Sequence, residues 1–393
     1  MFFATALGAA VPAAAGGVLD DGLPEIALGG GLTVQPLGRV LFDVGHVETP
    51  EGLGDVGLGW QDEFRAARLG LQVEHASGIG AKVELDFSDN YPLFTDAFLF
   101  AEIGDHVTVR LGQQKTPDSL EELTSGRFTS FLERAAFTDA FGFERRVGGS
   151  VDYLSGPLLV QGGIYTGNLD TFSDQVDTPL SFDGRVVLMP EMAGGQTLHL
   201  GASLHYRELE RDPGALTRYR QRPQFHATDT RLISTTRFDV DSETTYGAEA
   251  AWISGPLHLA GEVHWLETGN DVDGPNAGFF GGYAEAGFFL TGESRGYKPG
   301  RFDRTKPAKP LGQGGFGAVQ VNLRYDHLDL QDDAVGGGSQ DAILGSLMWI
   351  PTARTRVVLN GGWLDYDNAT LPDASGSRDY NVGMIALRTQ LDF

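Results

Sequence analysis

Apolar and polar residues alternate with a period of two along most of the chain. The last segment shows this most clearly, because Ile385, Leu387 and Leu391 share one face while Arg388 and Gln390 lie on the other. Successive side chains of an extended strand point to opposite sides, so this pattern predicts a β-strand with one apolar and one polar face. We count about sixteen such segments, each of roughly 9 to 14 residues.

The connections between these segments alternate between short turns and long loops. Ser155-Gly156-Pro157 and Ser254-Gly255-Pro256, for example, are tight turns between two alternating runs. Tight turns at one end and long loops at the other are typical of transmembrane barrels. The alternation and the connection lengths therefore predict an all-β fold, a transmembrane antiparallel β-barrel of about 16 strands.

A helical membrane crossing is not expected. Beyond the N-terminal region, no apolar run approaches the roughly 20 residues that a membrane-spanning helix needs. A closed barrel is the other structure that satisfies every backbone hydrogen bond inside a bilayer. A soluble β-rich binding protein is the alternative from another class, because the strands of a β-sandwich also alternate.

The composition fits strands and turns. Of 393 residues, 55 are Gly and none is Cys, and the formal net charge is −24. The absence of Cys excludes disulfides, thiolate metal sites and a cysteine nucleophile. The acidic balance argues against nucleic acid as a partner. No set of residues has the pattern of a catalytic site, so we expect no enzyme activity, no cofactor and no bound metal.

The N-terminal segment is predicted to be the remnant of a signal peptide. No charged residue occurs from Met1 to Leu19, and a weakly apolar run of small residues ends in Ala13-Ala14-Ala15, which resembles a cleavage site. We assign residues 1–15 to this remnant and expect residues 16–393 to form a single β-barrel domain.

Two long segments interrupt the strands. Residues 115–145 contain several arginines after a short run with helical character, and residues 208–240 form a long Arg-rich loop. In the second segment Arg218, Arg220 and Arg222 are spaced by two. An extended backbone would therefore point all three guanidinium groups to one side, as a row of cations.

Several short runs, in a fixed order along the chain, resemble the phosphate-selective porin family, the porin O and porin P group. The matching runs are 64–70, 112–117, 120–125, 131–134, 290–295 with Lys306-Pro307, 323–330 and 348–361. The resemblance implies a barrel of sixteen strands, usually trimeric, in which the third external loop folds inward as a constriction. Residues 115–145 correspond to this constriction loop, and residues 208–240 to an external loop.

The resemblance also implies which residues line the pore. Family members that select phosphate use arginines and lysines, a few hydroxyl groups and one acidic residue in the narrow zone. The candidates in this sequence are Arg65, Arg68, Lys82, Asp96, Lys115, Ser125, Arg127 and Arg134, with Arg218, Arg220 and Arg222 in the outer vestibule.

The sequence departs from the family pattern at two positions. A family Arg-Arg pair reads Arg65-Ala66, and strand parity makes Ala66 the inward residue, so one central cation is expected to be missing. Arg68 shares the inward parity and would compensate. A paired hydroxyl position reads Ser125-Gly126.

These observations predict an integral porin of the bacterial outer membrane. It would pass small hydrophilic solutes by passive diffusion, with anions such as phosphate as permeants, bound by charge-assisted hydrogen bonds. The alternative is a general or cation-preferring porin of the same fold, in which each arginine pairs with a lumen carboxylate. The expected partners are outer-membrane lipid, lipopolysaccharide bridged to acidic loops by divalent cations, and two further copies in a homotrimer.

Overall fold

The structure is a computed structural model that describes residues 23–54, 56–169, 180–209, 216–270 and 275–393. The predicted signal-peptide remnant, residues 1–15, lies outside the described residues. Among the described residues, no helix is long and apolar enough to cross a membrane.

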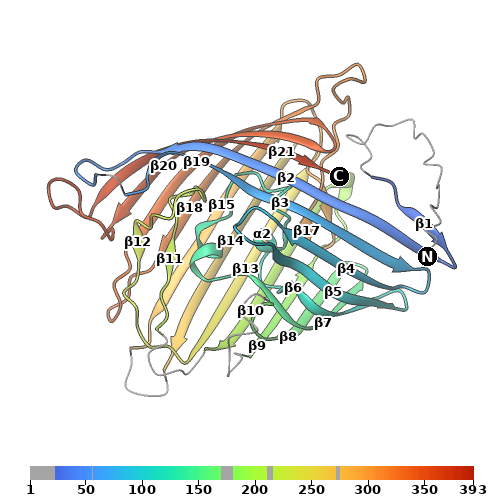
Figure 1. The fold of residues 1–393 in the computed structure, drawn as a ribbon, viewed down its shortest axis with the longest axis horizontal. Coiled ribbons are helices and arrows are strands. Elements are labelled where there is room, and N and C mark those ends of the chain that lie inside the picture. Colours follow the sequence, from blue (N-terminus) through green and yellow to red (C-terminus); the bar gives the residue numbers. More distant parts are fainter. Residues whose placement is uncertain (1–22, 55, 170–179, 210–215, 271–274) are drawn as a thin grey trace, which may run out of the picture.

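Sixteen antiparallel strands close into a barrel (Figure 1), as the alternating pattern predicts. Closure is complete because β2 (Leu32–Val47) pairs with β3 (Gly59–His75) on one side and with β21 (Tyr380–Asp392) on the other. A further short strand, β1 (Ile26–Gly29), pairs with the start of β2. The remaining barrel strands are β4 (Ile79–Asp86), β5 (Leu93–Ile103), β6 (Val107–Lys115), β7 (Arg145–Ser155), β8 (Leu158–Tyr165), β9 (Ser181–Leu188), β10 (Thr197–Glu208), β13 (Ser242–Ser254), β14 (Leu257–Gly269), β15 (Gly278–Phe289), β18 (Ala318–Asp329), β19 (Ser339–Thr352) and β20 (Thr355–Asp367).

The apolar face of the strands points outward and the polar face points into the barrel. On β21, Ile385 and Leu391 are exposed on the outside, whereas Arg388 and Gln390 are buried inside. This is the reverse of a soluble sandwich, in which apolar faces pack against one another. The barrel thus has the outer surface that a hydrocarbon environment requires.

Short turns and long loops lie at opposite ends of the barrel, as expected. The turn end carries connections such as 156–157, 255–256 and 353–354, and the loop end carries connections such as 116–144 and 209–241. The connection 290–317 is the exception, because it is long and begins at the turn end.

The predicted constriction loop comprises residues 116–144, between β6 and β7, and it folds into the lumen. It contains the short helices α2 (Leu120–Leu123) and α3 (Ala136–Ala140). Its apolar residues pack against the inner wall formed by β13 to β21. Phe137, for example, stacks on His264 of β14 with the ring centroids 4.3 Å apart. The inward-folded loop of the sequence prediction is therefore confirmed.

A second segment, residues 290–317, also enters the lumen and was not predicted. It contains β16 (Tyr297–Lys298) and β17 (Arg301–Phe302). Nη1 of Arg295 donates a hydrogen bond to Oγ of Ser130 in the constriction loop, at 2.7 Å. Nη2 of Arg185 on β9 donates to the carbonyl oxygen of Gly300, at 2.7 Å. The open part of the lumen is left between these two inserts and the opposite wall.

Candidate functional site

The open part of the lumen is a strongly basic cavity of about 720 Å³. Fifteen Lys or Arg residues line it, against five Asp or Glu residues. The whole chain contains 29 basic and 53 acidic residues, so about half of all basic residues gather around this one space. The basic residues are Arg39, Arg65, Arg68, Lys82, Arg110, Lys115, Arg127, Arg134, Arg145, Lys298, Arg301, Arg304, Lys306, Arg354 and Arg388.

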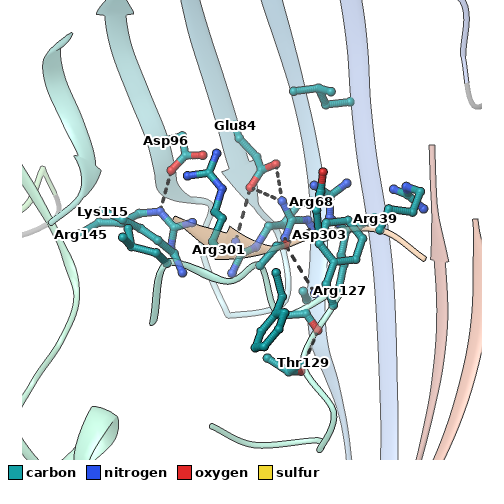
Figure 2. A pocket seen from close by; sticks show the side chains of 18 of the residues that line it. Arg39, Arg68, Glu84, Asp96, Lys115, Arg127, Thr129, Arg145, Arg301 and Asp303 are labelled. Atoms are coloured by element: carbon teal, nitrogen blue, oxygen red, sulfur yellow. Dashed lines mark hydrogen bonds and ion pairs between the residues drawn. The ribbon is translucent and has the colours of Figure 1, made fainter. Parts of the chain in front are cut away.

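One group of cations lies on the adjacent strands β2, β3 and β4, at positions whose side chains point inward. Nη2 of Arg39 donates hydrogen bonds to both carboxylate oxygens of Glu84, at 3.1 and 2.8 Å (Figure 2). Arg68 reaches the same carboxylate at 3.4 Å and pairs with Asp86 at 2.6 Å. Two guanidinium groups therefore share the single negative charge of Glu84.

Asp96 on β5 is shared in the same way. Nζ of Lys82 lies 2.6 Å from one of its carboxylate oxygens, and Nε of Arg145 lies 2.7 Å from the other. Lys82 comes from β4 and Arg145 from the start of β7. Two of the predicted pore residues, Lys82 and Asp96, are thus in direct contact on the cavity wall.

The constriction loop supplies the facing side of the cavity. Glu122 of α2 pairs with Lys115 at 2.8 Å and with Arg134 at 3.3 Å. Burial by itself would raise the pKa of Glu122, but the charges of Arg134 and then Lys115 outweigh it, so that the pKa lies below its ordinary value. Oγ of Ser125 accepts a hydrogen bond from Nε of Arg127, at 3.2 Å. Four predicted site residues therefore lie on one side of the cavity. Ser125, Arg127 and Arg134 belong to the constriction loop, and Lys115 contacts it through Glu122.

The C-terminal strand contributes a fourth shared carboxylate. Asp392 of β21 pairs with Arg127 at 3.3 Å, with Arg354 at 3.7 Å and with Arg304. Burial favours the neutral form of Arg127 and is the main reason that its pKa is lowered; Asp392 acts in the opposite sense. Residues 290–317, the constriction loop and β21 therefore meet at one buried negative charge.

The ion pairs do not neutralise the cavity. Among the described residues, thirteen of the fifteen cations have an acidic partner, and together they share nine carboxylates. Within that part of the chain, Arg301 and Lys306 form no ion pair. Burial, and after it the neighbouring charge of Arg110, lower the pKa of Arg301. The cavity therefore has an excess of positive charge that a mobile anion can satisfy.

Arg65 also lies on the cavity wall, contrary to the parity of the strand. Phe64 is paired with Phe42 and Ala66 with Leu41, so Arg65 is the extra residue of a β-bulge. Both Arg65 and Ala66 consequently line the cavity, and Arg65 lies 3.6 Å from Glu133 of the constriction loop. Ala66 thus lies inward, as strand parity predicts, and the bulge places Arg65 on the cavity wall beside it.

The three arginines of the long external loop lie away from the cavity. Arg218 and Arg220 are exposed and alternate with the buried residues Tyr219 and Gln221, as an extended backbone predicts. Arg222 instead turns toward two acidic partners, Asp139 at 3.6 Å and Asp229 at 3.2 Å. None of the three arginines is among the residues that line the cavity.

Sequence reasoning missed about half of the cationic wall. Arg39 has the same parity as Leu41 and Asp43, which are also inward, so extending the strand pattern to β2 would have found it. Residues 290–317 offer no such signal, and Arg301 and Arg304 reach the cavity only because this segment folds inward. The unusual length of a connection at the turn end is the one hint that the sequence contains.

Comparison with known proteins agrees with this architecture. The profile of the family "phosphate-selective porin O and P" matches residues 34–393. An uncharacterized protein of Caulobacter vibrioides is 47% identical over 365 residues, covering 91% of this chain and 73% of its own length. Porin O of Pseudomonas aeruginosa is 26% identical over 251 residues, covering 58% of this chain and 56% of its own length.

A solved structure shows the same fold at low sequence identity. The anion-selective porin from Comamonas acidovorans superimposes with a TM-score of 0.59 at 15% identity, over 92% of this chain and all of the other. The chain therefore belongs to the phosphate-selective porin O and P family, and this membership together with the barrel indicates an outer-membrane channel rather than an enzyme.

Proposed function

We propose that the protein is a channel of the bacterial outer membrane that selects small hydrophilic anions and lets them diffuse passively. The carrying observation is the charge of the cavity wall, where fifteen cations face five carboxylates in a chain whose net charge is −24. Local charge in a constricted pore decides ion selectivity, because it replaces the hydration that a permeating ion loses.

The distribution of these cations suits flux as well as binding. Glu84, Asp96, Glu122 and Asp392 each hold two or more cations, so the cations around these four carboxylates share their negative charge. An anion that enters can accept hydrogen bonds from successive guanidinium and ammonium groups without being trapped at one of them. A series of moderate sites allows both entry and release.

We further propose phosphate as one of the permeants. The family carries phosphate selectivity in its name, and Porin O is among the relatives. Around Asp96, the donors Lys82 and Arg145 flank an acceptor carboxylate. A protonated phosphate can accept from the two cations and donate its own O–H to the carboxylate, whereas chloride has no proton to donate.

The exposed pair Arg218 and Arg220 would act earlier, as a region of positive potential above the entrance. Their side chains lie on one side of the loop and contact none of the cavity residues. Such charges raise the local anion concentration rather than bind one ion, and their effect fades as salt screens them.

The competing function is a general or cation-preferring porin, and the ion pairs of thirteen lining cations are the observation that favours it. Planar bilayers decide between the two. In a KCl gradient the reversal potential should correspond to anion preference, and added phosphate should reduce the chloride current in a concentration-dependent manner. A reversal potential of the opposite sign would rule out the anion channel, and a chloride current unaffected by phosphate would rule out the phosphate site.

Lipopolysaccharide binding and the homotrimer stay predictions. Chemical cross-linking of the protein in native outer membranes would check the trimer. Fractionation of the same membranes would check the location.

A further inference from the structure

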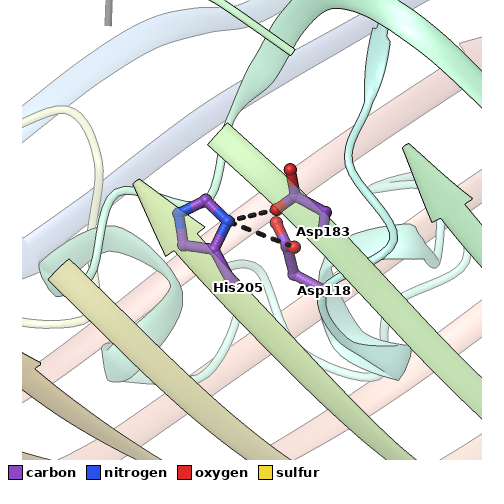
Figure 3. A group of neighbouring side chains, drawn as sticks. All are labelled: Asp118, Asp183 and His205. Atoms are coloured by element: carbon purple, nitrogen blue, oxygen red, sulfur yellow. Dashed lines mark hydrogen bonds and ion pairs between the residues drawn. The ribbon is translucent and has the colours of Figure 1, made fainter. Parts of the chain in front are cut away.

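A buried cluster of metal-binding residues lies where the constriction loop leaves the barrel wall. Asp118 of the loop, Asp183 of β9 and His205 of β10 each offer a donor atom, and these three atoms lie within 4.8 Å of one another (Figure 3). Their exposed fractions are 2%, 4% and 5%, so all three are shielded from water. The cluster takes no part in the basic cavity, since none of the three residues lines it.

The free oxygen atoms of both carboxylates are aimed at the imidazole. Oδ2 of Asp118 accepts a hydrogen bond from the hydroxyl of Thr116, and Oδ2 of Asp183 accepts one from Ser181 at 3.1 Å. Oδ1 of Asp183 and Oδ1 of Asp118 both face Nδ1 of His205, the latter at 3.8 Å. Hydroxyl groups that hold the outer oxygen of a ligand and orient the inner one are typical of metal sites.

One donor atom of this cluster has no hydrogen-bond partner among the described residues. Oδ1 of Asp118 is buried and accepts no hydrogen bond from any of them. Two carboxylates at such short range require either a shared proton or a cation between them.

The neighbouring cations offset the charge of the cluster only in part. The positive charge of Arg146 of β7 acts on Asp183, but Nη2 of Arg146 also lies 3.1 Å from Glu144. Arg207 of β10 pairs with Glu243. A divalent ion would match the two negative charges of Asp118 and Asp183 without displacing either arginine.

We propose that Asp118, Asp183 and His205 bind one divalent transition-metal ion, with Zn²⁺ as the best match, and that this ion fastens the constriction loop to β9 and β10. One imidazole nitrogen and two carboxylate oxygens suit Zn²⁺, with water in the fourth position, whereas Ca²⁺ and Mg²⁺ prefer all-oxygen sites. The ion coordinates Nδ1, so the neutral imidazole carries its single proton on Nε2 when the site is filled.

No metal site was expected from the sequence, in which Asp118, Asp183 and His205 are widely separated along the chain. The loop and two neighbouring strands bring them together. The site would stabilise the root of the constriction loop, and it is independent of which solute passes through the pore.

The test is calorimetric titration of Zn²⁺ into the full chain, purified in detergent after chelator treatment and without a histidine tag. We expect one site per chain with micromolar or tighter affinity. Ca²⁺ and Mg²⁺ should bind at least 100-fold more weakly. Absence of saturable Zn²⁺ binding up to millimolar concentration overturns the proposal and leaves a shared proton as the explanation of the cluster.

Variants locate the site. Asp118→Asn and Asp183→Asn should each weaken Zn²⁺ binding at least tenfold, whereas His327→Gln should leave it unchanged, because His327 pairs with Asp341 outside the cluster. Unchanged affinity in Asp118→Asn would place the ion elsewhere and overturn the proposal. A measurement on the wild-type chain avoids the risk that a variant misfolds. Bound Co²⁺ should give intense visible d–d bands that disappear when Zn²⁺ is added. Absence of these bands would contradict a tetrahedral site.

Discussion

Arg39 holds the carboxylate of Glu84 by both oxygens, at 3.1 and 2.8 Å, although the two residues lie on strands that are separated by β3. Arg68 of β3 adds a second guanidinium to the same carboxylate, at 3.4 Å. Asp96 and Glu122 are likewise shared by two cations and Asp392 by three, and this sharing leaves the wall of the pore positive even though most of its cations are paired.

Substitutions in the Arg39–Glu84 pair should shift selectivity in opposite directions. Arg39→Gln removes a positive charge from the cavity, so the anion-to-cation permeability ratio falls, whereas Glu84→Gln removes a negative charge and raises it. Glu84→Gln should also lower stability by about 3 kcal/mol, because two buried guanidinium groups lose their shared partner. Reversal potentials and thermal unfolding measure the two effects. A shift in the same direction for both variants would contradict the electrostatic explanation.

Arg301 is predicted to bind permeating anions directly, since it forms no ion pair among the described residues of the lumen. Arg301→Gln should lower the anion-to-cation permeability ratio roughly twofold, without the loss of stability that follows when a paired residue is removed. Lys309→Gln is the matched control, because Lys309 lies in the same segment but is exposed and does not line the cavity. Equal shifts for both variants would mean that only net charge matters.

The constriction loop is held to the far wall by Glu262 of β14. Its carboxylate accepts hydrogen bonds from the backbone N–H groups of Leu120 at 3.0 Å and Glu121 at 2.7 Å. The N–H of Leu120 also donates to Oε2 of Glu249, at 2.7 Å, so Glu262→Gln weakens this attachment without leaving Leu120 unpartnered and should cost about 1 kcal/mol. We expect noisier single-channel currents and a lower unfolding temperature. Glu267→Gln, on the outer face of the same strand, should change neither quantity.

Low pH should weaken the attachment of the constriction loop, because Glu122 becomes protonated. Its pKa is below its ordinary value of 4.5 in the folded protein, so the ionised group stabilises the fold above that pH, and this contribution is lost as the pH falls through the folded pKa. The unfolding temperature should therefore be flat from pH 8 to about 5 and fall at lower pH. Glu122→Gln should be less stable at pH 7 and lose less on acidification. A parallel decline in both proteins would assign the acid sensitivity to other carboxylates.

The outer arginines should act only at low ionic strength. The double variant Arg218→Gln with Arg220→Gln is expected to reduce anion conductance at 0.01 M salt, where the screening length is about 30 Å, and to match the wild type at 1 M, where it is about 3 Å. A deficit that persists at 1 M salt would instead indicate a binding site. Conductance measured across this salt range distinguishes long-range attraction of anions from binding at a site.

The strands and their two faces could be predicted because strand geometry is local. Ile385 and Arg388 lie on opposite faces of β21 as their parity requires, since successive side chains alternate wherever the backbone stays extended. Arg65 shows the limit of this reasoning. A β-bulge adds one residue to β3 and reverses the parity beyond it, and the bulge is defined by the pairing with β2 rather than by the residues of β3 alone.

By its own pattern, the sequence determined a barrel with an apolar exterior, tight turns at one end, and a long segment with several arginines between β6 and β7, which the family resemblance identified as a constriction loop. Tertiary structure alone decided which cations share a carboxylate, that residues 290–317 bring Arg301 into the lumen, and that Asp118, Asp183 and His205 meet. The reason is physical: alternation follows from backbone geometry within each strand, whereas these contacts depend on how barrel closure and inward-folded loops place distant segments against one another.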